Sequence, residues 1–242
     1  MIKKIITASL IVGLCFSLVG CKSVKGYSDL NKAQENMMKQ NSCHMVISSS
    51  VNGATKADAN VTDFVYKLND KGVMEYCQSQ QDASNKMVFC EVSDGEKTEQ
   101  WLLGNGWSNV DATAYTKDNP HRYLQLISGK IDKKNIAKMD KKTDNTNTIY
   151  NVAMDAKKLN KTVYKDADIT VKSQNVSFTV NKKGELICYN DKAVILDKES
   201  NVESEYALEV QLTEHNGITE IKKPDLQVKA SANATLKTSA KK

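Results

Sequence analysis

Apolar side chains alternate with polar ones along two long stretches of the chain, residues 43–115 and 148–213. A period of two places successive side chains on opposite faces of an extended strand. Turns such as Asp94-Gly95 and Asn105-Gly106 separate the alternating runs, and these residues tolerate the positive φ of a tight hairpin turn. The pattern therefore predicts long antiparallel meanders.

Helical periodicity appears before and between these stretches. Residues 27–40 place apolar side chains at three- and four-residue spacing, with Ser28 as the candidate N-cap. At mid-chain, Asn119-Pro120 predicts the start of a helix that ends at Gly129, and a second short helix is expected over Asp132–Met139. This order of elements predicts an α+β fold with one large curved antiparallel sheet.

The N-terminus combines a basic start with an apolar run that stops at Cys21. The run is about 15 residues long, shorter than the ~20 that a membrane-spanning helix needs, and it suits a signal peptide. Its last residues, Leu18-Val19-Gly20-Cys21, resemble the lipobox of bacterial lipoproteins. That resemblance implies cleavage between Gly20 and Cys21 and a diacylglyceryl group on the Cys21 thiol, which would anchor the mature chain to a membrane. We therefore expect residues 1–20 to be a lipoprotein signal peptide and residues 21–26 to be a tether.

The rest of the chain is expected to form one domain, residues 27–224, followed by a disordered tail rich in Lys, Ala and Ser, residues 225–242. Heavy use of Lys and Asn, with Arg122 as the single arginine and two prolines, is typical of a low-GC Gram-positive source. The expected location is the extracytoplasmic face of a Gram-positive cell membrane.

The formal net charge of +5 comes almost entirely from lysine rather than arginine. Lysine binds as a point charge and lacks the planar fork that suits phosphates and base edges. Nucleic-acid binding is therefore disfavoured. Attraction to anionic lipid headgroups or wall polymers stays open, as does a purely solubilising role for the lysines.

Four cysteines belong to the mature domain beyond the lipid-carrying residue: Cys43, Cys77, Cys90 and Cys188. An even number in an exported domain favours disulfides. In the hairpin expected over residues 72–92, Cys77 is placed opposite Cys90, at a separation that a disulfide can often close. Cys43 would then pair with Cys188. Free buried thiols are the alternative, and no cysteine pair has the spacing of a zinc site.

Patterns of catalytic or metal-binding residues are missing from the sequence. The three histidines, His44, His121 and His215, lie at no metal-ligand spacing, and neither a nucleophile elbow nor a phosphate-cradling glycine pattern occurs. Oxygen-bearing side chains at residues 197–201 alternate like the start of a calcium loop, but Val202 stands where that loop needs glycine. We therefore expect a non-catalytic protein without a metal or a cofactor.

Large apolar residues occupy both faces of several expected strands. Val73, Val88 and Val92 share one face. On the other face, Met74 and Tyr76 are expected to pair with Met87 and Phe89. An exposed sheet normally keeps one face polar, so helices, a ligand or a partner must cover these residues. Ordinary core packing is one explanation. The other is a groove lined for an apolar ligand, which suits Met and Tyr because Met adapts its shape and Tyr carries a polar tip.

The order of elements resembles that of lipoproteins of the LolA/LppX-like superfamily, including its uncharacterised Gram-positive branch. The shared features are the lipobox at Cys21, the first helix ending at Met37-Met38, the strand meander, the "WLLGNGW" hairpin, the Tyr123-Leu124 helix and the closing strand that runs into "NGITEIKKP". The resemblance implies a curved antiparallel sheet that forms an unclosed half-barrel, with helices on its concave side. It also implies that the concavity can carry acyl chains.

These observations together predict a membrane-anchored, non-catalytic lipoprotein, expected to be a monomer, that holds a lipid or another apolar ligand in the concavity of its sheet. The alternative is a surface module that docks a protein or a cell-wall polymer and has a fully packed core. A pocket too small for an acyl chain would favour the alternative. The residues expected to line the ligand groove are Met45, Ile47, Phe64, Tyr66, Met74, Tyr76, Met87, Phe89, Tyr123, Leu124 and Ile127.

Overall fold

The computed structural model describes residues 24–52 and 60–226. Strands occupy the two stretches that alternate with period two, and neighbouring strands are antiparallel. The expected signal peptide and Cys21 lie outside the described residues, as does most of the expected tail. The strands are β1 (Ser42–Val51), β2 (Asn60–Leu68), β3 (Met74–Gln81), β4 (Met87–Ser93), β5 (Thr98–Leu102), β6 (Gly106–Val110), β7 (Ile136–Thr143), β8 (Asn147–Met154), β9 (Ile169–Asn181), β10 (Leu186–Asp197) and β11 (Glu203–Thr213).

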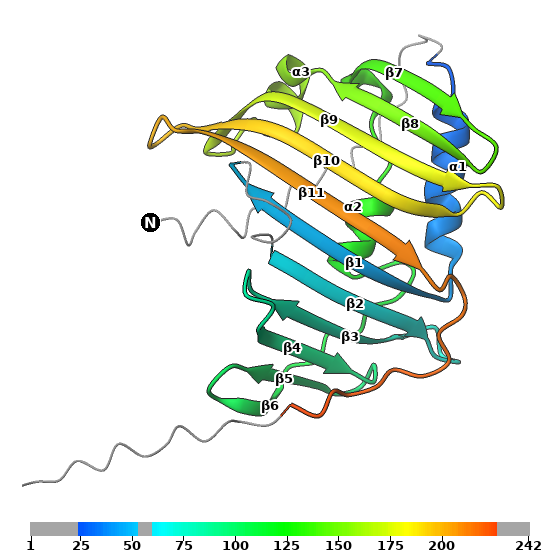
Figure 1. The fold of residues 1–242 in the computed structure, drawn as a ribbon, viewed down its shortest axis with the longest axis vertical. Coiled ribbons are helices and arrows are strands. Elements are labelled where there is room, and N and C mark those ends of the chain that lie inside the picture. Colours follow the sequence, from blue (N-terminus) through cyan, green and yellow to red (C-terminus); the bar gives the residue numbers. More distant parts are fainter. Residues whose placement is uncertain (1–23, 53–59, 227–242) are drawn as a thin grey trace, which may run out of the picture.

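The strands form an 11-stranded sheet in which two meanders meet at β1 and β11. The order is β6-β5-β4-β3-β2-β1-β11-β10-β9-β8-β7. Although β1 and β11 are far apart in the sequence, they pair along their length, with Ile47 opposite Val210. The terminal strands β6 and β7 lie at opposite ends of this order and the sheet curves without closing (Figure 1). The predicted unclosed half-barrel is confirmed.

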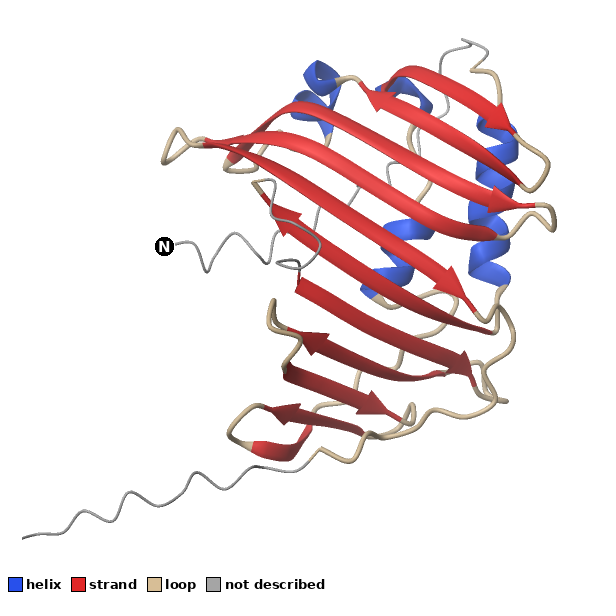
Figure 2. Cartoon of the chain, in the orientation of Figure 1, coloured by secondary structure: helices blue, strands red, loops and turns tan. Residues whose placement is uncertain are grey.

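The helices lie behind the sheet in Figure 2. They are α1 (Tyr27–Lys39), α2 (Arg122–Ser128) and α3 (Ala156–Thr162), with a 3-10 turn η3 (Lys133–Asn135). Leu30 of α1, Leu124 of α2 and Leu159 of α3 join one hydrophobic core with the inner face of the sheet. The fold is α+β, as the sequence predicted. None of the helices in the described ranges has the length and apolar character needed to cross a membrane.

The helix α1 forms as expected, but its start differs. Leu30, Ala33 and Met37 are buried at three- and four-residue spacing. The N-cap is Gly26, whose φ of 87° is left-handed, and no side chain caps the helix. The prediction that Ser28 caps α1 is therefore wrong, because Ser28 already lies in the first turn.

The start of α2 also differs from the expectation. Asn119 and Pro120 precede the helix, and His121 is the N-cap. The His121 side chain accepts a hydrogen bond from the Tyr123 backbone N–H and so satisfies one of the free donors of the first turn. The helix ends at Gly129, as predicted.

The expected second helix over Asp132–Met139 is wrong. The chain makes the single turn η3 and then continues as β7, which pairs with β8. A bulge after Ile136 shifts the register, so Ile136 and Met139 both lie opposite buried residues of β8. Two apolar residues three positions apart therefore share one face of a bulged strand, a spacing that also fits a helix.

The β3–β4 hairpin is shifted by two residues from the expected register. Cys77 lies opposite Val92, and Cys90 lies opposite Ser79. Next to the turn, Gln81 lies opposite Met87, one residue beyond the expected register, and a bulge between Gln80 and Gln81 adds the second residue. The Asp82 side chain fixes where the chain reverses, because it accepts hydrogen bonds from the backbone N–H groups of Ser84 and Lys86.

The hairpin also keeps apart residues that the sequence analysis expects to pair. Tyr76 lies opposite Ser93, whereas Phe89 lies opposite Gln80, farther along the same two strands. The expected pairing of Met74 and Tyr76 with Met87 and Phe89 is therefore wrong.

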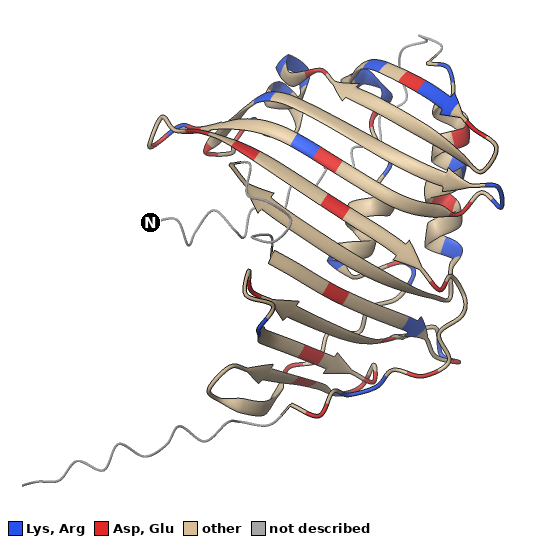
Figure 3. Cartoon of the chain, viewed as in Figure 1, with Lys and Arg blue, Asp and Glu red and all other residues tan. Residues whose placement is uncertain are grey.

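Charges of both signs are interspersed over the chain, and many lie in the loops, α3 and β7 (Figure 3). Several lysines pair with carboxylates, such as Lys141 with Asp29 at 2.7 Å and Lys138 with Asp140 at 2.8 Å. The excess of lysine does not gather into one basic patch in this view. This distribution fits the solubilising role that the sequence left open.

Candidate functional site

The inner face of the sheet and the helix α2 bring most of the predicted groove residues together. Met45, Ile47, Phe64, Tyr66, Met74 and Tyr76 of β1–β3 and Leu124 and Ile127 of α2 are each at most 6% exposed. Tyr123 is half-buried and packs against the same core. Met87 and Phe89 are half-buried on β4 and do not belong to this core.

His121, at the start of α2, lies within a group of aromatic side chains. Its imidazole stacks on Phe64 with 4.5 Å between ring centroids. The rings of Tyr76, Tyr115 and Tyr123 lie 5.3, 4.8 and 5.0 Å from it. Burial lowers the pKa of His121 to about 3, because the charged imidazolium would lose its hydration there. The side chain is therefore neutral near pH 7 and holds the start of α2 to the sheet by packing.

A buried glutamine of α1 holds the other end of α2. The Gln34 side-chain Nε2 donates to the carbonyl oxygen of Gly129 at 2.7 Å and to that of Ile127 at 3.5 Å. Carbonyls at a helix C-terminus lack partners within the helix, so Gln34 supplies one. Its own Oε1 is buried and has no hydrogen-bond partner among the described residues.

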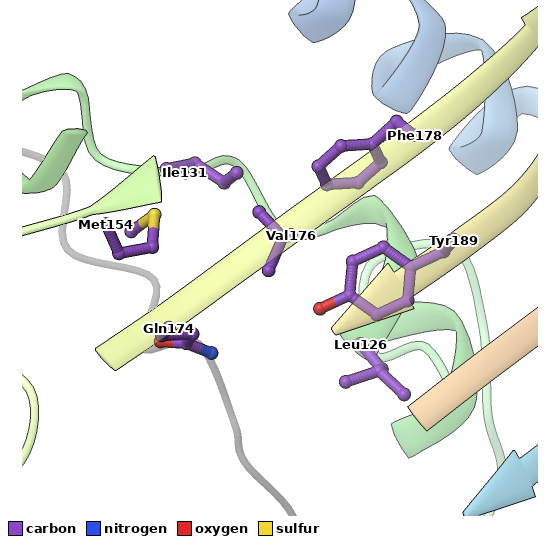
Figure 4. A pocket seen from close by; sticks show the side chains of 8 residues that line it. Leu126, Ile131, Met154, Gln174, Val176, Phe178 and Tyr189 are labelled. Atoms are coloured by element: carbon purple, nitrogen blue, oxygen red, sulfur yellow. The ribbon is translucent and has the colours of Figure 1, made fainter. Parts of the chain in front are cut away.

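Two small hollows lie at the two ends of α2, each with a volume of about 10 Å³. The first is shown in Figure 4, and its lining includes Leu126, Gly129, Ile131, Gln174, Phe178 and Tyr189. The lining of the second includes Met37, Tyr66, Leu68, Met74, Pro120 and Leu124. Each hollow has room for about one water molecule. Neither holds an acyl chain in this structure.

A buried carboxyl group lies behind the first hollow. Asp191 on β10 is 3% exposed. Its Oδ2 accepts hydrogen bonds from the Gln174 Nε2 at 2.8 Å and the Tyr189 hydroxyl at 3.3 Å. Burial raises the pKa of Asp191 to about 6, although these two hydrogen bonds oppose the shift. Its Oδ1 has no partner in the described part of the chain.

Cys77 and Cys90 lie close together although they are not directly opposite. Their Sγ atoms are 4.0 Å apart, and both residues are free thiols in the structure. The hydrogen bond between them lowers the pKa of Cys77 and raises that of Cys90. A disulfide needs a sulfur–sulfur distance of about 2.05 Å, so this bond stays a prediction.

The expected pairing of Cys43 with Cys188 is wrong for this fold. Cys43 is fully buried on β1, whereas Cys188 on β10 lies opposite the exposed Gln211 of β11. The two cysteines thus lie on opposite faces of the sheet, with β11 between their strands. Two strand spacings amount to roughly 10 Å, beyond the ~7 Å that a disulfide can span between Cα atoms.

A cysteine–histidine contact offers no activated nucleophile. The Cys43 Sγ lies 3.7 Å from the Nδ1 of His215. Burial raises the pKa of Cys43 to about 12, opposite to the shift that a reactive thiolate needs. Among residues 24–52 and 60–226, no three His, Cys, Asp or Glu side chains gather closely enough to hold a metal ion.

The sequence reading missed the polar groups in this interior. Gln174 and Asp191 sit at buried positions of β9 and β10 where the alternating pattern otherwise places apolar side chains. A polar residue at one position of an otherwise apolar strand face could have indicated these buried polar groups. Gln34 interrupts the buried side of α1 in the same way.

No family model and no curated protein matches the chain. Among solved structures, it is similar to the lipoprotein LppX of Mycobacterium tuberculosis, with a TM-score of 0.48 and 9% identity over 81% of this chain and 97% of that one. It is similar to LprF from Mycobacterium bovis, with a TM-score of 0.47 and 12% identity over 85% and 99% of the two chains. A LolA superfamily protein from Nitrosomonas europaea gives a TM-score of 0.28 and 10% identity over 79% and 94%. The Gram-positive branch stays a prediction.

Proposed function

We propose that this chain is a non-catalytic lipoprotein, anchored through Cys21 at the extracytoplasmic face of the cell membrane, that holds a lipid or another apolar ligand between its sheet and α2. The observation that supports this proposal most is the position of α2. This short helix lies over the apolar inner face of the sheet and has a hollow at each end. Moving α2 outward would join the two hollows into one apolar groove.

The size of the hollows requires such a movement. Pockets for small molecules usually measure about 300–1,000 Å³, far more than the 10 Å³ of either hollow. The arrangement in which Leu124 and Ile127 fill the groove is thus the closed state. A ligand shifts the population toward an open state only if it binds that state more tightly.

The energies of closure and binding are comparable. Exposing a buried Leu or Ile side chain costs about 1.5–3 kcal/mol, and burying an acyl chain returns about 0.8 kcal/mol per CH₂. A long acyl chain can therefore offset the loss of the α2 contacts. A small ligand with few apolar carbons cannot, so the closed interior selects for long apolar ligands.

A second candidate function is favoured by the same small hollows. In that case the interior stays fully packed, and the protein docks a surface protein or a wall polymer through its outside. The two candidates differ in one measurable property, the presence of a ligand within the folded chain.

Native mass spectrometry of the full-length lipoprotein, extracted in a mild detergent, separates them. The carrier proposal expects discrete adducts of acyl-lipid mass that are lost on denaturation. Phe64→Asn, which places a polar group on the groove floor, should weaken the adducts, whereas Asp140→Asn on the exposed surface of β7 should not. A chain that stays bare after incubation with a membrane lipid extract would favour the docking module.

A further inference from the structure

The first hollow is apolar along most of its lining but has polar atoms at one side. In Figure 4 the Tyr189 hydroxyl and the Gln174 amide lie on the same side of the cluster, away from Phe178 and Ile131. Both groups are hydrogen-bonded to the Oδ2 of Asp191. The carboxyl group is therefore held in one orientation by two residues that line the hollow.

This arrangement leaves hydrogen-bond acceptors without donors. The Oδ1 of Asp191 and the Oε1 of Gln34 are buried without a partner among the described residues. Gln34 is tied through its Nε2 to Gly129, which lines the same hollow. Buried polar atoms are nearly always hydrogen-bonded. The interior beside the first hollow therefore lacks a hydrogen-bond donor for these two oxygen atoms.

The buried carboxylate of Asp191 restricts which chemical groups are suitable hydrogen-bond donors. None of the ion pairs within the described residues includes Asp191, so hydrogen bonds alone balance its carboxylate in this part of the chain. A buried carboxylate is stabilised by an opposite charge or by hydrogen bonds to its charged form. An ammonium group satisfies both needs, and a hydroxyl group satisfies the second.

We infer that this part of the hollow recognises a hydrogen-bond-donating head, a hydroxyl or an ammonium group, on an apolar ligand, with Asp191 as the acceptor. The inference rests on the proposed function, because the apolar part of the ligand would occupy the groove that α2 closes. A ligand whose head only accepts hydrogen bonds, such as an ester, would leave the Oδ1 of Asp191 unsatisfied.

Four probes with a sixteen-carbon chain test the inference: hexadecylamine, hexadecanol, methyl palmitate and hexadecane. Their binding to the full-length protein in mild detergent is compared by native mass spectrometry in competition. The amine and the alcohol should each bind at least about tenfold more tightly than the ester, a ratio that corresponds to about 1.4 kcal/mol.

Asp191→Asn provides the sharper version of the test. The Asn side chain can keep its oxygen toward Gln174 and Tyr189 and then presents an N–H group where Oδ1 was. The preference should therefore reverse toward methyl palmitate. Asp140→Asn is the matched control, since this side chain is exposed on β7 and should leave the preference unchanged. If Asp191→Asn does not fold, the preference of the unaltered protein decides alone.

The outcomes separate the inference from the proposed function. Equal binding of all four probes, unchanged by Asp191→Asn, would overturn the inference, leave the carrier proposal standing and assign the free acceptors to a trapped water molecule. Failure of every probe to bind would overturn the carrier proposal, and the inference with it.

Discussion

The imidazole of His121 lies on the ring of Phe64, with 4.5 Å between centroids and an angle of 18° between the planes. This contact joins the first residue of the α2 segment to the middle of β2. Together with the hydrogen bond from Gln34 to Gly129, it attaches both ends of the helix to the rest of the domain. The position of α2 therefore depends on a few side-chain contacts, and single substitutions can remove these contacts one at a time.

Leu124→Ala tests the role of α2 in closing the groove. Leu124 is 4% exposed, and its truncation should cost about 3 kcal/mol of stability in urea unfolding. Because the change also weakens the closed state, we expect more of the acyl-lipid adduct in native mass spectrometry.

Leu159→Ala is the matched control, since Leu159 of α3 is 2% exposed and lies on another helix. It should lose similar stability without a gain of adduct. Equal adduct levels in the two variants would argue against α2 as the closing element.

His121 and Asp191 should make stability depend on pH in opposite directions. The pKa of His121 falls from 6.5 to about 3 on folding. The unfolded chain therefore binds more protons in this window, so the contribution of His121 is complete above pH 6.5 and is lost as the pH falls. The pKa of Asp191 rises from 3.8 to about 6. The folded chain binds more protons there, so Asp191 destabilises the fold increasingly as the pH rises from 3.8 to 6.

Two variants separate these effects. His121→Asn keeps an N-cap acceptor but does not titrate. Between pH 7 and pH 5, its free energy of unfolding should therefore fall by about 2 kcal/mol less than that of the unaltered protein. Asp191→Asn should instead make the loss of stability on acidification steeper by about 1 kcal/mol over the same range. Urea unfolding at pH 5, 6 and 7 measures both.

The neighbouring groups do not obscure this comparison. Tyr164 and Tyr189, which face Asp191, have raised pKa values and stay neutral in this range. Burial also lowers the pKa of His215, but His215 contributes equally to each protein and cancels. The same pH profile in all three proteins would contradict the account of these two residues.

The sequence predicted the sheet and the helices because their signals are local. Antiparallel hairpins are predicted by the alternation along β1–β3 and β8–β11 together with the turn residues between the strands. These signals do not depend on residues that are distant in the sequence. The buried residues of β1–β3 and α2 were predicted to face the interior for the same reason, since each belongs to a regular apolar series, while their role as groove residues stays a prediction. The pairing of β1 with β11 joins the two meanders, and no local pattern reports it.

The errors arose where a single residue changes the register. The bulge after Ile136 turns a strand pattern into a spacing typical of a helix. The Asp82 turn and the bulge beside Gln81 together move Cys90 by two positions relative to Cys77. The pairing of Cys43 with Cys188 failed because it was inferred by elimination, without knowledge of which strand separates them. These features depend on three-dimensional neighbours rather than on composition.

At the proposed extracytoplasmic location, Cys77 and Cys90 are expected to form a disulfide. Their Sγ atoms, 4.0 Å apart, need a small side-chain rotation to bond. The two thiols lose two protons and two electrons to an extracytoplasmic thiol oxidant, and the chain becomes lighter by two hydrogen atoms. Mass spectrometry of cysteine-containing peptides after alkylation without reductant detects the change.

Cys43 and Cys188 serve as internal controls, because their separation should leave both alkylated once the protein is denatured. Alkylation of all four cysteines without reductant would show that Cys77 and Cys90 stay as thiols.

The central claim is that an apolar ligand enters between the sheet and α2. Hydrogen–deuterium exchange of the full-length protein, with and without bound hexadecanol, tests it most directly. The claim predicts faster amide exchange in α2 and its flanking loops when the ligand is bound, while β9 and β10 stay protected. Bound ligand with unchanged exchange throughout α2 would contradict the account, because the ligand would then lie elsewhere on the molecule.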